Sequence, residues 1–218
     1  MLRVRYQTLE LPNVDLHVRS LWDKQQFEDP GEVAEQHGVS PASWAFSGVI
    51  WPSAYVLARL MCDFPIAGKR ILEVGCGLGL ASLVLSGRYA DITATDHNPA
   101  VEGFLVENTR LNASSAIPFV RAGWTDAESD LGRFDLIIGS DLLYEPDHAA
   151  QLSAFIHRHA AVASEVILVD AGRGFHNKFC RALEGLGYVG HIDRSITMSN
   201  QGVPFKGCVV RYQNRAVG

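Results

Sequence analysis

The sequence predicts an α/β protein with a mostly parallel sheet that carries helices on both faces. From residue 70 onward, short apolar runs alternate with longer runs of helical spacing, which is the order typical of a parallel sheet. A glycine-rich turn joins the first apolar run to the helix that follows it. Two β-rich runs, 188–196 and 207–212, close the chain and predict an antiparallel hairpin.

Each core element has its own signal. Ile71, Leu72 and Val74 form a short apolar run typical of a buried strand, while Phe104 and Leu105 belong to an apolar stripe with helical spacing. The predicted strands are 70–74, 91–95, 117–121, 134–140 and 165–170. The predicted helices between and after them are 80–88, 99–112, 147–160 and 174–186.

The first third of the chain does not show this alternation of strands and helices. Residues 2–18 alternate apolar and polar around Pro12-Asn13, which predicts a β-hairpin. Residues 23–47 are polar and predict a short helix and a loop, and a helix then begins at Trp51-Pro52, with proline in its first turn. We therefore expect a hairpin and loop extension over 1–45 and the α/β domain over 46–218.

Composition narrows the class of protein. With 218 residues, 47% hydrophobic and 20% charged, the chain suits one globular domain. It has no apolar run of about 20 residues and no signal-peptide core at its start, so we expect no membrane span. The net charge of −5 without a basic cluster argues against nucleic acid as a partner.

The cysteines and histidines predict no metal site. The four cysteines show neither a CxxC pair nor metal-ligand spacing, which indicates reduced, buried thiols and a cytoplasmic location. His157 and His159 lie two residues apart on a predicted helix, so they face different directions.

The turn after the first strand predicts a ligand site. It reads Glu73-x-Gly75-x-Gly77-x-Gly79, and such a turn lets a ligand approach bare backbone at a helix N-terminus. A dinucleotide fingerprint requires glycine at the sixth position, which is Leu80 here. The turn therefore disfavours a nicotinamide cofactor, and a purely structural turn is the simpler alternative.

Two carboxylates follow later strands. Asp96 ends the second strand, where an acid accepts hydrogen bonds from both hydroxyls of a ribose; the alternative is that it helps to cap the next helix. Asp141 and Tyr144 follow the fourth strand, at the carboxyl edge where open α/β sheets bind ligands.

Together these motifs resemble class I S-adenosylmethionine-dependent methyltransferases, and specifically methyltransferase family 16. That family includes lysine-methyltransferase-like and nicotinamide N-methylase-like proteins. The glycine turn resembles motif I of the class, and Asp141-x-x-Tyr144 resembles the DxxY signature of the family. Further matches within the resemblance, which spans about 45–215, are Gly48-Val49-Ile50-Trp51, Asp96, Asn108, Asn112 and Trp124.

The resemblance implies a Rossmann-like, seven-stranded fold and a role for each matching residue. Gly75, Gly77 and Gly79 would admit the methionine part of the cofactor S-adenosylmethionine, with Glu73 nearby to order it. Asp96 would hold the ribose. The remaining assignments are Trp124 to the adenine, Trp51 to the methionine end, Ser140 to backbone contacts beside the sulfonium, and Asp141 with Tyr144 to the acceptor site. Both tryptophans have a plain alternative as core residues.

Several functions stay open at this point. The first is N-methylation of a protein lysine, in which Asp141 attracts the ammonium. The second is N-methylation of a small amine or heterocycle, whose pocket would be sealed, whereas a protein acceptor needs an open groove. In both cases the hairpin and the 198–206 loop would form the walls. An adenine N6-methyltransferase would carry two prolines where Leu142 and Leu143 stand. A cofactor-binding module without catalysis is the remaining alternative.

Overall fold

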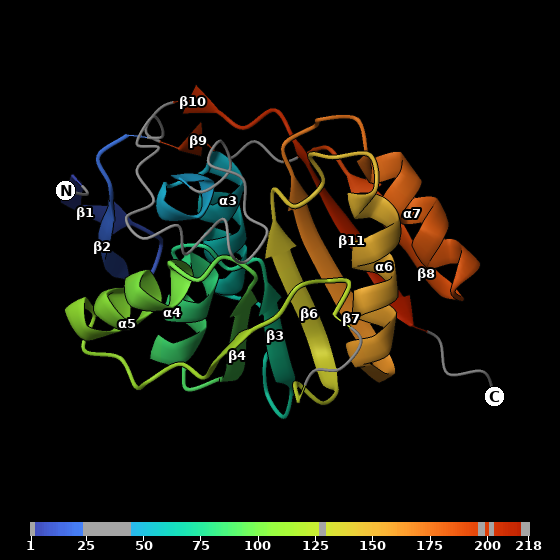
Figure 1. Cartoon of the computed structure of the whole chain (residues 1–218), viewed down its shortest axis with the longest axis horizontal. Helices are drawn as coiled ribbons and strands as arrows, with labels where there is room; N and C mark the ends of the chain where they lie inside the picture. The colour runs from blue at the N-terminus through green and yellow to red at the C-terminus, as the bar shows by residue number, and fades with distance from the viewer. Residues whose placement is uncertain (1–2, 24–44, 127–129, 196–198, 201–202, 215–218) are drawn as a thin grey trace.

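The computed structural model describes residues 3–23, 45–126, 130–195, 199–200 and 203–214. In chain order the elements are β1 (Val4–Glu10), β2 (Asp15–Leu21), the 3-10 helix η1 (Ala45–Gly48), α3 (Pro52–Met61), β3 (Arg70–Val74), α4 (Leu80–Gly87), β4 (Asp91–Asp96), α5 (Val101–Leu111), β5 (Phe119–Arg121), β6 (Phe134–Ser140), α6 (His148–His159), β7 (Ala160–Asp170), α7 (His176–Gly185), β8 (Tyr188–Asp193), β9 (Ser199–Asn200), β10 (Val203–Pro204) and β11 (Cys208–Asn214). Figure 1 shows their arrangement.

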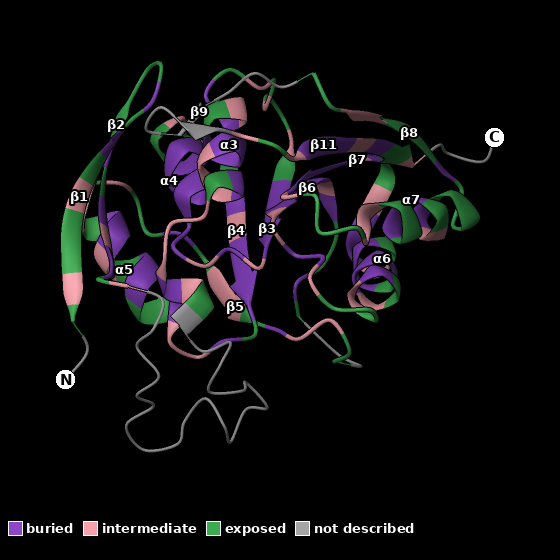
Figure 2. Cartoon of the chain, turned by 90° about the horizontal axis from the view of Figure 1, so that it is seen from above, coloured by how far each residue is buried: buried purple, intermediate pink, exposed green. Residues whose placement is uncertain are grey.

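Seven strands form the central sheet in the order β5-β4-β3-β6-β7-β11-β8. The first five are parallel to one another, while β11 runs antiparallel to both of its neighbours. Helices cover both faces, with α3, α4 and α5 on one side and α6 and α7 on the other (Figure 2). The predicted fold class is confirmed.

The strands are buried on both faces because their alternate residues enter two separate apolar cores. Ile71 and Ile138 pack into the core beneath α3, α4 and α5. Leu72 and Ile137, one position along in each strand, pack into the core beneath α6 and α7. Continuous apolar runs therefore mark strands whose two faces are both covered.

Strand β7 is longer than predicted. It begins at Ala160, directly after α6 ends at His159, whereas the sequence predicts a strand from residue 165. Its pairing with β6 shifts register between Phe134 and Leu136, and Ala163 has a positive φ of 61°. An irregular first half of this kind breaks the alternation from which strands are recognised in sequence.

The predicted hairpin of β1 and β2 is present, but the expectation that it forms a wall of the pocket is wrong. It packs on α5, where Asn108 Oδ1 accepts from Arg19 N at 2.7 Å and Asn112 Oδ1 accepts from His17 N at 2.9 Å. Asn108 also donates to Leu78 O at 3.2 Å and so joins the hairpin to the glycine turn. The hairpin covers the α5 side of the molecule and, among the described residues, contributes nothing to the pocket wall.

The second expected wall, the 198–206 loop, is described only in part. Residues 196–198 and 201–202 lie outside the described residues, as do 24–44, where a short helix and loop are predicted. The described part holds the two-residue ladder of β9 and β10. Among the described residues, no helix has the length and apolar character needed to cross a bilayer.

Candidate active site

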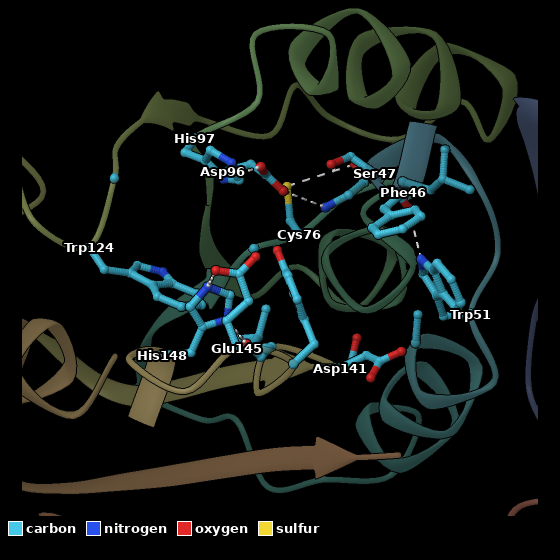
Figure 3. Close-up of a pocket in the computed structure, with 18 of the residues that line it drawn as sticks. Phe46, Ser47, Trp51, Cys76, Asp96, His97, Trp124, Asp141, Glu145 and His148 are labelled. Carbon is cyan, nitrogen blue, oxygen red and sulfur yellow. Dashed lines mark hydrogen bonds and ion pairs between the residues drawn. The ribbon is translucent and has the colours of Figure 1, made fainter. Parts of the chain in front are cut away.

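A cavity of about 840 Å³ opens at the carboxyl ends of β3, β4 and β6. Figure 3 shows its side chains pointing into one space from both halves of the sheet. Eight of the ten predicted site residues line it: Trp51, Gly75, Gly77, Asp96, Trp124, Ser140, Asp141 and Tyr144. The two others, Glu73 and Gly79, lie behind its wall.

The floor of the cavity is the turn between β3 and α4, which only glycine fits. Gly75 has a φ of +59°, and a Cβ there would come within 2.4 Å of Leu142 Cδ2. Gly77 has a φ of +52°, and its Cβ would lie 3.1 Å from the carbonyl oxygen of Ser47. Both positions need a left-handed backbone and close approach, so any side chain would displace the wall and fill the floor.

Glu73 lies beneath this floor and holds the start of α4. It is 3% exposed, and its Oε2 accepts from Ser82 N at 2.8 Å and from the Ser82 hydroxyl. Burial raises the pKa of Glu73 to about 7, against the hydrogen bonds of Ser82, which lower it. Glu73 therefore anchors the first turn of α4 and is not placed to touch a ligand directly.

Asp96 is a buried carboxylate held by backbone donors. Its Oδ2 accepts from Gly77 N at 3.1 Å, and its Oδ1 accepts from Asn98 N at 2.9 Å. Asn98 Oδ1 in turn accepts from Ala100 N at 3.0 Å, a turn just before α5, whose N-cap Ala100 has no side-chain capping bond. His97 lies 3.5 Å from Asp96, and a hydrogen bond to this carboxylate raises the pKa of His97. Asp96 thus both shapes the glycine turn and faces the cavity.

An aromatic row borders the cavity on the α6 side. The ring of His148 packs edge-on against Trp124, with centroids 5.0 Å apart, and against Tyr144, with centroids 4.4 Å apart. The Nδ1–H of His148 donates to Leu142 O at 2.9 Å, because a carbonyl only accepts. Burial raises the pKa of Tyr144 to about 12, so its phenol keeps its proton at neutral pH.

Trp51 closes the opposite side, just before α3. Its Nε1–H donates to Phe46 O at 2.8 Å, and its ring meets the Phe46 ring edge-on at 5.8 Å. The guanidinium of Arg173 lies over the Trp51 ring at 5.7 Å, a distance that permits a cation–π contact.

Asp141 is paired with that same arginine. Arg173 Nε lies 2.9 Å from Asp141 Oδ1 and Arg173 Nη2 lies 3.0 Å from Oδ2, a bidentate geometry. The backbone of Asp141 is left-handed, with a φ of +55°, and its N–H donates to Val169 O at 2.9 Å. Left-handed backbone is uncommon outside glycine and is concentrated at functional positions, where surrounding contacts hold it in place.

Sequence reasoning missed several residues of the wall. The polar and charged ones are Ser47, Cys76, His97, Arg121, Thr125, Asp126, Glu145, His148, Gln151 and Arg173. His148 begins α6 and Tyr144 lies in the loop before it, so no helical spacing links the two residues in the sequence. Arg173 comes from the loop after β7, and no local pattern links it to Asp141.

Comparison with known proteins agrees with this geometry. The profile of the family described as lysine methyltransferase matches residues 39–184. The chain belongs to the lysine methyltransferase family. The predicted resemblance of the chain to methyltransferase family 16 is confirmed.

Individual relatives share about a third or less of their residues with this chain and align with only part of it. The electron transfer flavoprotein beta subunit lysine methyltransferase of Rattus norvegicus is 28% identical over 144 residues, which cover 64% of this chain and 55% of that protein. Protein N-lysine methyltransferase METTL21A of Danio rerio is 35% identical over 107 residues, covering 45% and 48%. The chain spans about half the length of the curated relatives it matches.

Solved structures show the same fold. A TehB-like SAM-dependent methyltransferase from Corynebacterium glutamicum superposes with a TM-score of 0.59 and 21% identity, covering 86% of this chain and 100% of that one. The predicted Rossmann-like methyltransferase fold is confirmed.

Proposed function

We propose that this chain is an S-adenosylmethionine-dependent N-methyltransferase that modifies a lysine side chain of a protein. The observation that carries the proposal is the single cavity that joins the glycine turn and Asp96 to the DxxY pair, Asp141 and Tyr144. Membership of the lysine methyltransferase family supports the same activity.

The cavity fits the cofactor. Its volume of about 840 Å³ lies in the range of ligand sites of about 300–1,000 Å³. Gly75 and Gly77 line the cavity and have no side chain, so a ligand can approach their backbone directly. Asp96 Oδ2 accepts the Gly77 N–H and keeps a further lone pair for a ribose hydroxyl, while Oδ1 accepts from Asn98 N and lies beside His97.

Each predicted cofactor residue keeps a role within this proposal. Asp96 would bind the ribose and Trp124 the adenine, while Gly75, Gly77 and Ser140 would line the methionine part and Trp51 would close its end. Glu73 and Gly79 would act one step away, by fixing the turn and the start of α4. When bound, the cofactor supplies a methyl group that is attached to a positively charged sulfur. Once the methyl group is transferred, this sulfur becomes a neutral thioether.

The chain's own residues must then align the acceptor and remove its charge. Methyl transfer is an in-line displacement, so holding the two reacting atoms within about 3–3.5 Å is the main catalytic task. A lysine, with an unperturbed pKa near 10.4, must lose a proton before it attacks. Glu145, exposed at the rim, would attract the incoming ammonium, and Tyr144 would orient the amine as a neutral phenol.

The sequence suggests that Asp141 attracts the incoming ammonium, but the structure favours a different role for it. Its carboxylate is not free to attract an ammonium, because Arg173 already pairs with both of its oxygens. We infer that Arg173 leaves Asp141 when the cationic acceptor arrives, so that the acceptor exchanges for the guanidinium. The exchange selects for a cation, which favours lysine over a neutral heterocycle.

The test uses radiolabelled S-adenosylmethionine, the purified chain and size-fractionated cell extract. A lysine acceptor predicts label in a protein band, and it predicts that label disappears when the extract's lysines are first acetylated, because an amide nitrogen does not attack the methyl group. Asp141→Ala supplies the control for transfer by this site. Label confined to the low-mass fraction would instead support the small-amine alternative, and a chain that binds the cofactor but never transfers label would support a binding module.

Partners and compartment follow as predictions of the same proposal. A protein acceptor is expected, and the net charge of −5 gives no reason to expect nucleic acid. All four cysteines are free and buried, which is consistent with the predicted cytoplasmic location.

A further inference from the structure

Three side chains from different elements meet behind the loop that carries Arg173. Asp170 ends β7, His176 begins α7 and Cys208 begins β11. Asp170 and Cys208 are direct partners in the antiparallel ladder. One donor atom from each of the three residues lies within 4.8 Å of the other two. None of the three lines the active-site cavity.

Two of these donor groups lack a hydrogen-bond partner among the described residues. Asp170 is 2% exposed, and its Oδ2 is buried without a partner. His176 Nδ1 is buried and lies 3.3 Å from Asp170 Oδ1, without hydrogen-bond geometry. Buried polar atoms are nearly always hydrogen-bonded in folded proteins, so two unpartnered atoms in one cluster point to a missing occupant.

The donor set selects the kind of occupant. A carboxylate oxygen, an imidazole nitrogen and a thiol sulfur suit zinc and similar transition-metal ions, whereas Mg²⁺ and Ca²⁺ take oxygen ligands. Tetrahedral zinc with bonds of about 2.0–2.3 Å holds its ligand atoms roughly 3.3–3.7 Å apart. His176 Nδ1 lies 3.3 Å from Asp170 Oδ1, so the imidazole stands beside the carboxylate whose second oxygen, Oδ2, has no partner among the described residues.

We propose that Asp170, His176 and Cys208 form a site for a zinc-class transition-metal ion, with water in the fourth position. Gly172 N donates to Asp170 Oδ1 at 2.8 Å, which fixes the carboxylate and leaves Oδ2 for the ion. Outer-shell hydrogen bonds of this kind commonly orient metal-binding carboxylates.

One contact must open when the ion binds. Arg194 Nη2 lies 3.0 Å from His176 Nε2, which accepts its hydrogen bond. Coordination through Nδ1 moves the ring proton to Nε2, and Nε2 then no longer accepts from a guanidinium. Arg194 is exposed and turns into solvent, so ion binding and the Arg194 contact compete.

The proposed metal site joins the two ends of the loop that carries Arg173, the ion-pair partner of Asp141. Residues 171–175 run from Asp170 to His176 and include Gly172 and Gly174, whose φ values of +83° and +96° make the loop costly to order. An ion that joins both ends of this loop and β11 would reduce its freedom. The expected consequence is a better-ordered Arg173 over Asp141, even though the ion itself takes no part in methyl transfer.

The test is a Co²⁺ titration of the full chain after treatment with a chelator. We expect one equivalent to bind with a thiolate-to-cobalt charge-transfer band in the near ultraviolet. Cys208→Ser should abolish the band, and Asp170→Asn, which keeps the shape of the side chain and its bond to Gly172, should weaken binding about 10–100-fold. Cys62→Ser, a buried cysteine at the end of α3, is the matched control and should keep the band.

Arg194→Ala separates the proposal from a purely structural cluster. If Arg194 competes with the ion, this variant binds Co²⁺ several-fold more tightly than the wild type. If the contacts among Asp170, His176 and Arg194 serve only to hold the loop, the variant lowers thermal stability and leaves Co²⁺ affinity unchanged. A wild-type chain without the band, or a band that survives Cys208→Ser, would overturn the proposal.

Discussion

The two ends of the cavity hold their carboxylates in different ways. Asp96 accepts from two backbone N–H groups, at Gly77 and Asn98, both near it in the folded turn. Asp141 pairs with one side chain, Arg173, whose own side chain is 43% exposed. The first carboxylate is fixed by the backbone, while the second is held by a cation that another cation can replace.

This difference suggests a division of tasks between the two ends. Backbone donors cannot move without unfolding the turn, so the cofactor end is preorganised and its affinity depends on geometry. A partly exposed ion pair contributes little to stability, so the acceptor end is able to rearrange when a substrate arrives. This difference between the cofactor end and the acceptor end can be tested with variants that each remove one contact at one of the two ends.

The largest effect is expected beneath the cofactor end, at Glu73. Its pKa of about 7 in the folded chain exceeds the ordinary 4.5, so between these values the folded state binds the proton more tightly than the unfolded state. Stability therefore falls as pH rises from about 4.5 to 7, by about 3 kcal/mol from this group. Glu73→Gln should lose that dependence. Urea unfolding of both proteins at pH 5 and pH 8 measures it.

The comparison needs a control for general effects of pH. Glu102→Gln changes an exposed glutamate on α5 and should follow the wild-type curve. If the curves for Glu73→Gln and wild type run parallel between pH 5 and 8, then the buried carboxyl is not what makes the turn sensitive to pH.

The next effect concerns Asp96. Asp96→Ala removes both the proposed ribose acceptor and the acceptor of Gly77 N–H, so we expect affinity for S-adenosylhomocysteine to fall about 100-fold, or about 2.7 kcal/mol. Asp96→Asn keeps one oxygen acceptor and should lose about tenfold. Isothermal titration calorimetry gives both values. Equal, wild-type affinity in the two variants would show that the carboxylate only shapes the turn.

The same contrast explains what the sequence predicts well and what it does not. The glycine turn, Asp96 and the strand ends are recognisable because each depends on residues close together in sequence, and eight predicted residues do line the cavity. The pairing of Arg173 with Asp141 depends on how far the loop after β7 folds back, and no local spacing encodes it. Whether Glu73 meets the ligand or only holds the turn also cannot be read from the sequence, because a carboxylate beside a glycine turn looks the same whether it points outward or inward.

The position of the hairpin also depends on long-range contacts. The alternation in residues 2–18 predicts two strands, but not which surface they cover. Asn108 and Asn112 settle that by bonding the backbone of β2, and in sequence both look like ordinary helix-surface residues.

A smaller effect is expected at Arg173. Arg173→Gln frees Asp141 from its competing cation, so the KM for a lysine-containing acceptor should fall about tenfold, equivalent to about 1.4 kcal/mol, with cofactor affinity unchanged. Steady-state kinetics against a fixed acceptor, together with calorimetry, separate the two. Arg121→Gln alters another arginine of the cavity wall and serves as the control. A rise in KM would mean that Arg173 helps to bind the acceptor and does not compete with it.

The smallest effect is expected at Tyr144. With its pKa raised to about 12, the phenol stays protonated between pH 7 and 10, so the pH dependence of kcat/KM in this range should come from the acceptor amine. Tyr144→Phe should therefore keep the rising slope of the wild-type profile while lowering every point about threefold, as expected for one neutral hydrogen bond. His148→Phe, which alters the ring against which Tyr144 packs, should lower the same profile without bending it. A slope that flattens in Tyr144→Phe would show instead that the tyrosine itself takes the proton from the amine.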